Sequence, residues 1–206
     1  GIRRHAFNKL NKDIYSQKIK INKIKECFCG ASNFLALSQI DRFGLPFGSQ
    51  ICKSCGLVTQ TMRIDESSMK YFYENIYWPL IEGKEGSYFT FTKETHSDPF
   101  FSSQMNFEKK EITIFEVGCG AGNRILNLSS IFEKKGYKVD KCGCDYSINA
   151  LKVAQTRKIK TVHGGMKDLA KLGKADVVIL SHVFEHLTDL KVAMAELEKL
   201  VHDKSF

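Results

Sequence analysis

The sequence predicts an α/β fold with a parallel sheet, preceded by a small cysteine-rich module. From Glu111 onward, short apolar runs typical of strands alternate with amphipathic segments typical of helices. A turn with three glycines follows the first of these runs, and two close cysteine pairs stand well upstream of it. Strands that alternate with helices usually form a parallel sheet with helices on both faces, so we expect that architecture for residues 111–206.

The basic residues of the chain are concentrated near its N-terminus. The formal net charge of the 206 residues is +8 at pH 7, but residues 1–25 hold eight lysines and arginines and a single acid, Asp13. We therefore predict a basic N-terminal arm over residues 1–25. Such an arm either stays solvated, which is the commoner behaviour of charged tails, or contacts anionic partners.

Membrane insertion and secretion are not predicted. The sequence has no run of about 18 apolar residues, which a membrane-spanning helix would need. The basic N-terminus is not followed by the apolar stretch of a secretory signal. We therefore expect a cytoplasmic protein, in which an odd number of cysteines favours metal ligation or burial over disulfide bonds.

Four cysteines within residues 26–61 have the pattern of a structural zinc site. "CFCG" stands at one end of this loop-rich segment and "CKSCG" at the other, and each pair is followed by glycine, which favours a tight knuckle. We predict a zinc ribbon over residues 26–61, with buried free thiols as the alternative. Four cysteine ligands leave no open coordination position, so no catalysis is expected there. The first pair has C-x-C spacing, one residue shorter than the usual C-x-x-C. The predicted Zn²⁺ ligands are Cys27, Cys29, Cys52 and Cys55.

Residues 62–110 are rich in aromatic side chains, and we predict a helical connector or lid there. The first interpretation is that the aromatic rings pack against a core. The alternative is a lid over cofactor and acceptor, in which Tyr71, Tyr73 or Tyr77 presents a hydroxyl. The aromatic residues are "YFYENIYW" (Tyr71 to Trp78), Phe89, Phe91, Phe100, Phe101 and Phe107.

The C-terminal part of the sequence predicts four strands and three helices. Ser147 is a favourable N-cap and Gly136 a favourable helix end, which sets two of the boundaries. The predicted strands are residues 112–117, 138–144, 159–163 and 175–181, and the predicted helices are residues 122–135, 147–157 and 189–202.

The glycine-rich turn lies in "EVGCGAGN", between the first predicted strand and its helix. Glycines there let backbone N–H groups approach a nucleotide-like ligand closely. The spacing of Gly118, Gly120 and Gly122 is G-x-G-x-G, and Asn123 stands where the dinucleotide fingerprint has its third glycine. Glu116 is an awkward neighbour for a pyrophosphate but suits a ligand with an ammonium and a sulfonium group. This favours S-adenosylmethionine over NAD.

A second acid supports this choice of cofactor. Asp145 ends the second predicted strand, where a carboxylate can accept hydrogen bonds from both ribose hydroxyls. The order of strand, glycine turn, helix, second strand and terminal acid makes a purely structural role of the glycines the less favoured interpretation.

These motifs resemble those of the class I S-adenosylmethionine-dependent methyltransferases. "EVGCGAGN" is similar to their first motif, "GCDYS" to their second, and "ADVVILSHVFEHLTDL" to their fourth strand and the turn after it. The resemblance implies a Rossmann-like domain over residues 111–206 that binds S-adenosylmethionine. It also implies roles for single residues: Glu116, Gly118, Gly120 and Gly122 at the methionine moiety, Asp145 at the ribose, Tyr146 at the adenine with Met166 as a weaker candidate, and His182 near the sulfonium.

The upstream module extends the resemblance. A zinc ribbon ending like "CKSCGLV" and leading into a tyrosine-rich stretch like "YFYENIY" is similar to the sugar C-methyltransferases of polysaccharide and deoxysugar biosynthesis. This implies a sugar nucleotide or a related small metabolite as the acceptor. His186 is a candidate general base, although an orienting or helix-start role for Glu185 and His186 is the more common one. His182, Glu185 and His186 also match the H-x-x-E-H pattern of some zinc peptidases, but a match directly after a strand is only weak evidence for a metal site.

The fourth predicted strand, "ADVVIL", is apolar throughout, as strands inside parallel sheets are. In the strand order of the family it would form a bare edge, because the sequence contains no fifth strand. We therefore expect either a truncated form lacking the later strands or an oligomeric partner that covers the edge. Two other functions stay open: an RNA methyltransferase that uses the basic arm and zinc ribbon, and a non-catalytic binding module.

Overall fold

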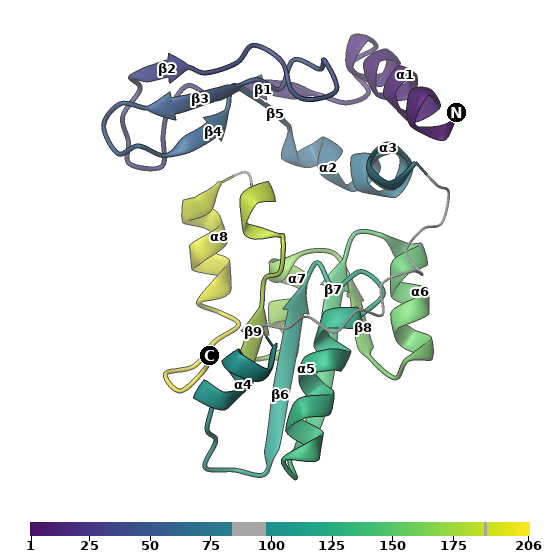
Figure 1. The fold of residues 1–206 in the computed structure, drawn as a ribbon, viewed down its shortest axis with the longest axis vertical. Helices are drawn as coiled ribbons and strands as arrows, with labels where there is room; N and C mark the ends of the chain where they lie inside the picture. Colours follow the sequence, from purple (N-terminus) through teal and green to yellow (C-terminus); the bar gives the residue numbers. More distant parts are fainter. Residues whose placement is uncertain (84–97, 188) are drawn as a thin grey trace. The chain divides into compact units, whose positions relative to one another are not determined.

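The computed structural model describes residues 1–83, 98–187 and 189–206. Two compact units are distinguished by their contacts: residues 1–83 with 188–191, and residues 84–187 with 192–206 (Figure 1). Phe89 and Phe91 of the predicted aromatic connector lie outside the described residues. Within the described part of the chain, no helix is both long and apolar enough to cross a lipid bilayer.

The second unit is built on a four-stranded parallel sheet with the strand order β8-β7-β6-β9. The predicted α/β fold with a parallel sheet is thus confirmed. The strands are β6 (Glu111–Val117), β7 (Lys138–Asp145), β8 (Lys160–His163) and β9 (Val177–Ile179). The helices are α4 (Asp98–Gln104), α5 (Asn123–Lys134), α6 (Ile148–Thr156), α7 (Met166–Leu169) and α8 (Leu190–Leu197), with short 3₁₀ turns at Ala170–Leu172 and Phe184–His186.

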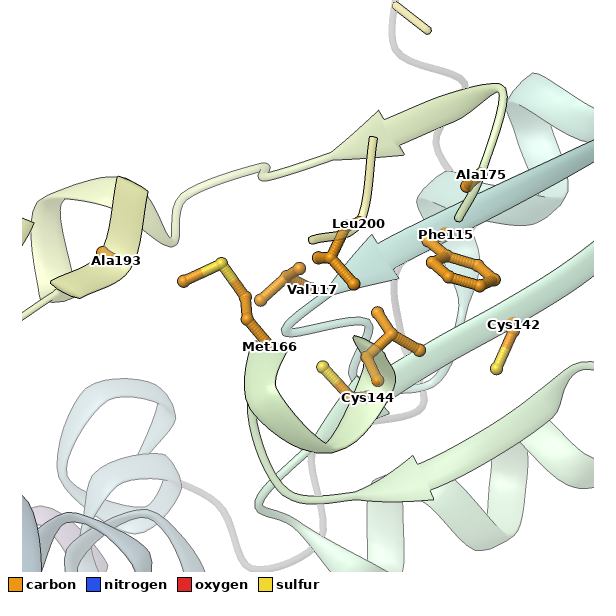
Figure 2. Packing of buried hydrophobic residues seen from close by; sticks show 9 residues of the cluster. Phe115, Val117, Cys142, Cys144, Met166, Ala175, Ala193 and Leu200 are labelled. Atoms are coloured by element: carbon orange, nitrogen blue, oxygen red, sulfur yellow. The ribbon is translucent and has the colours of Figure 1, made fainter. Parts of the chain in front are cut away.

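The alternation of side chains along β6 divides the core into two layers. Ile112 and Ile114 point to the face covered by α5 and α6, where they pack with Ile125, Leu128 and Phe132. Phe115 and Val117 point to the other face. There they pack with cysteines of β7, with Met166 and Leu169 of α7, and with Ala193 of α8 (Figure 2). Because both faces of β6 are covered, its apolar side chains point to both sides of the sheet, and Glu116 is the buried exception among them.

Helix α6 begins with a side-chain cap, as the sequence predicts. The Oγ atom of Ser147 accepts a hydrogen bond from the N–H of Ala150 at 3.3 Å. Replacing Ser147 with alanine is expected to lower the free energy of unfolding by about 1 kcal/mol, because one first-turn N–H group loses its acceptor. Urea denaturation measures this loss. Ser130→Ala, which changes an exposed serine in the middle of α5, is the matched control and is expected to change stability by less than about 0.5 kcal/mol.

Part of the outer edge of β9 is covered by residues of the same chain, while the truncation or oligomeric partner stays a prediction. Phe206 lies beside this edge: its N–H donates to the carbonyl of Asp176 and its carbonyl accepts from the N–H of Val178, both at 2.9 Å. Nearby, the N–H of Ala175 donates to the carbonyl of Leu200 at 2.8 Å. The chain's own last residues therefore satisfy edge groups of β9 that were expected to be unpaired.

The first unit contains α1 (Ile2–Tyr15), β1 (Ile21–Lys23), β2 (Phe34–Ala36), β3 (Ser49–Cys52), β4 (Val58–Gln60), β5 (Met62–Ile64), α2 (Glu66–Phe72), a π-helical turn (Tyr73–Tyr77) and α3 (Trp78–Glu82). Strand β1 pairs with β5, and β2, β3 and β4 form a three-stranded antiparallel sheet. The two sheets are separate, so this unit owes much of its stability to its helices and loops.

Residues 2–15 form a helix with a buried face rather than a solvated arm. Ala6 and Leu10, one helical turn apart, are 2% and 1% exposed and pack with Ile76 and Leu80. Asp13 is also buried; its Oδ2 atom is 2.7 Å from Lys9 Nζ and accepts from the Tyr71 hydroxyl at 3.0 Å. The apolar spacing thus outweighs the dense positive charge of this segment, most of which stays on the exposed face of α1.

The cysteine-rich segment shares the core of this unit. Leu45 and Phe47, which lie between the two cysteine pairs in the sequence, are buried in the same cluster as Leu10 of α1 and Ile76. The aromatic residues after it also pack: the rings of Tyr73 and Tyr77 contact each other at 4.9 Å between centroids. These contacts favour the packing interpretation of the tyrosine-rich stretch, and the Tyr71 hydroxyl is engaged by Asp13.

Candidate cofactor site and cysteine cluster

The glycine turn joins β6 to α5 at the carboxyl end of the sheet. Gly118, Gly120 and Gly122 all have positive φ, at 66°, 51° and 81°, a region that side chains with a Cβ atom rarely adopt. Two of them are also closely packed. A Cβ atom on Gly118 would lie 2.6 Å from Cγ2 of Val183, and one on Gly122 would lie 2.0 Å from Cδ1 of Ile159. The turn therefore requires glycine for its conformation and for the approach of its neighbours.

Asp145 lies next to this turn, as predicted from the sequence. Its Oδ2 atom accepts a hydrogen bond from the N–H of Gly120 at 2.8 Å, and its Oδ1 atom accepts from the N–H of Ser147 at 2.7 Å. Burial raises the pKa of this carboxyl above its ordinary value, although the N–H groups of Ser147 and Gly120 partly offset the rise. Each oxygen retains a lone pair, so the carboxylate can also accept from the hydroxyl groups of a ligand.

Glu116 lies on the face of β6 that α5 covers. Its side chain is 3% exposed, and its Oε2 atom accepts from the N–H of Ile125 at 3.1 Å, in the first turn of α5. The carboxylate therefore satisfies a backbone donor at the helix N-terminus, where negative charge is favourable. This contact gives Glu116 a structural role beside the predicted one at the methionine moiety.

Two other predicted residues, Tyr146 and Met166, lie shortly after the ends of β7 and β8. Tyr146 follows β7, and its hydroxyl is close to Gly165, since a Cβ atom there would lie 2.8 Å from it. The backbone carbonyl of Tyr146 is 3.2 Å from Nε2 of His163, which ends β8. Met166 is only 4% exposed and belongs to the core cluster of Figure 2, so its side chain packs with Val117 and Ala193 instead of lining open space.

The segment after β9 carries the two predicted histidines. His182 has a φ of 53°, an uncommon value for a residue other than glycine, and its Nδ1 atom is 3.5 Å from Oε1 of Glu185. His186 is exposed in the turn Phe184–His186. Val183 follows His182 in the sequence, and one of its methyl groups lies against Gly118. The segment therefore reaches the glycine turn through Val183, which the sequence analysis did not single out.

Arg157 is the second residue that sequence analysis missed. It lies at the C-terminal end of α6, and its Nη1 atom donates to the carbonyl of Ala121 at 3.1 Å and to Oδ1 of Asn123. These contacts span 36 and 34 residues of sequence. Nothing near Arg157 in the sequence marks it as a neighbour of the glycine turn.

Cys119, inside the turn, is not an available nucleophile. It is 5% exposed, and its sulfur packs against Gly143 of β7. Burial, together with the carboxylates of Glu116 and Asp145, raises the pKa of this thiol far above its ordinary value. The thiol is therefore protonated at neutral pH and acts as a small core side chain.

The four predicted zinc ligands come together at one end of the first unit. The sulfur atoms of Cys27 and Cys55 are 3.6 Å apart, those of Cys29 and Cys52 are 3.7 Å apart, and all four lie within 4.8 Å of one another. Sulfur atoms at about 2.3 Å from a tetrahedral zinc ion would be separated by about 3.8 Å. The residues therefore fit a zinc ion in both number and spacing.

The unusual C-x-C spacing is accommodated by the two knuckles. The N–H of Gly30 donates to the carbonyl of Cys27 at 2.8 Å, whereas the N–H of Gly56 donates to the carbonyl of Cys52 at 2.9 Å, so the first knuckle closes one residue earlier. Both glycines have positive φ, at 86° and 77°. The shorter pair thus presents two sulfur atoms as well as the longer pair does.

The pKa of one thiol in the cluster, that of Cys52, is lowered by its surroundings. Burial by itself raises the pKa of Cys52, but N–H groups of Cys55 and Ser54 point at its sulfur and bring the pKa below its ordinary value. The Cys52 thiol can therefore ionise at neutral pH before a metal binds. The pKa of Cys55 moves the other way: the N–H of Leu57 lowers it, but hydrogen bonds with Cys27 and Cys29 outweigh this and raise it to about 12.

The second unit is an α/β fold with a glycine turn at the carboxyl end of its parallel sheet, and a known family matches this part of the chain. Residues 115–205 match the family model described as a methyltransferase domain. This match begins inside β6 and includes the glycine turn, Asp145 and the segment after β9. It supports the resemblance to S-adenosylmethionine-dependent methyltransferases, and it does not extend to the cysteine-rich segment. No curated protein sequence matches the chain.

Solved structures of related fold include methyltransferases. The YcgJ protein from Bacillus subtilis is 19% identical over 52% of this chain and 47% of its own length, with a TM-score of 0.42. A protein from Methanococcus maripaludis described as an S-adenosyl-L-methionine-dependent methyltransferase is 15% identical over 52% of each chain, with a TM-score of 0.39. PKMT2 from Rickettsia typhi, solved with AdoHcy, is 17% identical over 56% of this chain and 24% of its own, with a TM-score of 0.43. The chain thus spans about half the length of the first two structures.

Proposed function

We propose that the second unit binds S-adenosylmethionine and that the protein to which it belongs transfers the methyl group to a sugar nucleotide or a related small metabolite. The main support for this cofactor is that the glycine turn and Asp145 lie together. The N–H of Gly120 donates a 2.8 Å hydrogen bond to Oδ2 of Asp145. The family match over residues 115–205 supports the same cofactor. The sugar-type acceptor is supported by the resemblance of "CKSCGLV" and the tyrosine-rich stretch to sugar C-methyltransferases.

The side chains divide the binding task between two ends of the ligand. The remaining lone pairs of Asp145 accept the ribose hydroxyl groups, and the glycines, which carry no side chain, let the backbone of the turn lie close to the methionine end. Tyr146 covers the adenine. When bound, the cofactor supplies an electrophilic methyl group on a sulfonium. His186, exposed after β9, is the candidate to take a proton from the acceptor.

The proposed cofactor is tested by measuring the affinity of the chain for S-adenosylhomocysteine with isothermal titration calorimetry. The wild-type chain is expected to bind it, and Asp145→Asn to bind at least about tenfold more weakly, because the neutral amide is a poorer acceptor and one amide oxygen cannot replace two. Asp140→Asn is the matched control, since Asp140 lies on the same strand but pairs with Lys160 at the surface. Binding of NAD instead, or equal affinity of both variants, would contradict the proposal.

We also propose that Cys27, Cys29, Cys52 and Cys55 hold a structural Zn²⁺ ion. Its support is the fit of the sulfur spacings to a tetrahedral site. The ion would tie β3 to the loop that precedes β2, and we assign it no step in methyl transfer.

A further inference from the structure

The glycine turn needs support from outside itself. Its three glycines have more conformational freedom than any other residue, so the turn loses much entropy when it is fixed. Gly122 is the N-cap of α5 and contributes no side chain to hold the first turn of the helix. A ligand that bound an unsupported turn would have to order it at the expense of affinity.

One support comes from Asp145, through the N–H of Gly120. A further support comes from the connection between α6 and β8, residues 157–159. Arg157 donates from Nη1 to the carbonyl of Ala121 at 3.1 Å and to the side chain of Asn123. Two residues later, the methyl group of Ile159 occupies the space beside Gly122 where a Cβ atom would lie. Hydrogen bonds from Arg157 and packing by Ile159 thus both hold the turn.

Asn123, at the position of the third glycine in the dinucleotide fingerprint, gives Arg157 a contact that glycine could not give. A glycine at this position would leave Arg157 with the carbonyl of Ala121 as its sole acceptor in the turn. The amide of Asn123 adds a second acceptor on the first residue of α5, so the guanidinium bridges the turn and the helix. A guanidinium suits this bridging because it is permanently charged, planar and rich in donors.

The end of α6 fixes the position of Arg157. Lys158 has a φ of 61°, the left-handed conformation that often ends helices, and the N–H groups of Lys158 and Ile159 return to the carbonyls of Gln155 and Ala154 at 3.0 and 3.3 Å. This ending turns the chain so that Arg157 and Ile159 both face the turn. The Arg157 side chain is therefore attached to a backbone whose conformation is fixed by these hydrogen bonds.

We propose that Arg157 is a positioning residue for the cofactor: through Ala121 and Asn123 it holds the glycine turn in the conformation that receives an S-adenosyl nucleoside. The inference rests on the proposed cofactor. It adds that affinity for this class of ligand depends on a side chain that need not touch it.

The test is a double-mutant cycle on binding of S-adenosylhomocysteine. Arg157→Ala and Asn123→Ala are each expected to weaken binding about fivefold to tenfold. The double variant should bind no more weakly than the worse single variant, because Arg157→Ala already removes the bond that Asn123→Ala removes. Arg157→Lys keeps the charge and a donor and is expected to recover part of the affinity. Gln155→Ala is the matched control: it removes the 2.7 Å bond from Gln155 to Thr161, which also ties α6 to β8 but does not touch the turn.

Hydrogen exchange of the backbone amides provides a readout without ligand. Residues 118–124 are expected to exchange faster in Arg157→Ala and Asn123→Ala than in the wild type or in Gln155→Ala. If the wild type binds and Arg157→Ala binds equally tightly, the positioning role is wrong while the proposed cofactor stands. If the wild type binds no S-adenosylhomocysteine, the proposed function fails and the positioning role fails with it.

Discussion

Replacement of Cys55 with serine is expected to release a bound zinc ion and to destabilise the first unit, although Cys55 is exposed. An exposed side chain has little packing to lose, and substitution of such a residue normally changes stability only slightly. A zinc ligand is different, because the ion's binding free energy contributes to folding. We expect the zinc content to fall from one ion per chain to nearly none, and the melting temperature of the first unit to fall by roughly 10 °C.

The comparison of exposed and buried cysteines makes this test specific. Cys29→Ser and Cys55→Ser change exposed residues, and Cys52→Ser changes a buried one; all three should lose zinc to the same extent. Ser54→Ala, in the same knuckle, is the control and should retain the ion. Metal analysis and thermal unfolding with and without a chelator give the two readouts. If the exposed cysteines can be replaced without loss of metal or stability, the free-thiol alternative is correct.

The order of strands and helices in the second unit could be predicted because each boundary has a local cause. The apolar pattern of β6 and the helix cap at Ser147 can each be recognised from a few consecutive residues. The observed strand Lys138–Asp145 differs from the predicted strand 138–144 by a single residue. The glycine turn and Asp145 could also be predicted, since a strand, a turn and the end of the next strand must meet at one edge of a parallel sheet. The observed helix α8, Leu190–Leu197, is shorter than the helix predicted over residues 189–202.

The features that were missed depend on contacts between distant residues. Arg157 and Val183 reach the glycine turn from the ends of other elements, and neither has a sequence neighbour that identifies its partner. The buried face of α1 was missed for another reason. A signal for it was present, because Ile2, Ala6, Leu10 and Ile14 recur at helical spacing, but the prediction followed the positive charge of residues 1–25 instead. The partners Ile76 and Leu80 lie far along the chain.

Asp176 is expected to be the most sensitive charged residue of the second unit. It is 2% exposed and lies just before β9. Its Oδ1 atom is 2.8 Å from Nζ of Lys109 and 3.0 Å from Nε2 of His202, and its Oδ2 atom accepts from the N–H of Thr113 at 2.8 Å. One carboxylate thus joins the start of β6, the segment before it and the residues after α8.

Replacing Asp176 with alanine is expected to lower the free energy of unfolding by roughly 2–4 kcal/mol, because the N–H of Thr113 loses its acceptor inside the protein. The value stays below that of a fully buried ion pair, since Lys109 is 59% exposed and can be solvated by water. Urea unfolding of the second unit measures the loss. Glu111→Ala, which removes an ion pair at the surface with Lys138, is the matched control and should change stability little.

The pH dependence of unfolding separates the charge of Asp176 from its packing. Burial alone would raise the pKa of this carboxyl, but hydrogen bonds from Lys109, the N–H of Thr113 and His202 outweigh it, so the pKa in the folded state lies below the ordinary value of 3.8. The unfolded chain therefore binds a proton first as pH falls. The stabilising contribution is complete above about pH 4 and is lost as pH falls through the lower pKa of the folded state. Asp176→Asn should flatten this acid limb of the stability curve, whereas an unchanged limb would show that the carboxylate carries no charge-dependent stabilisation.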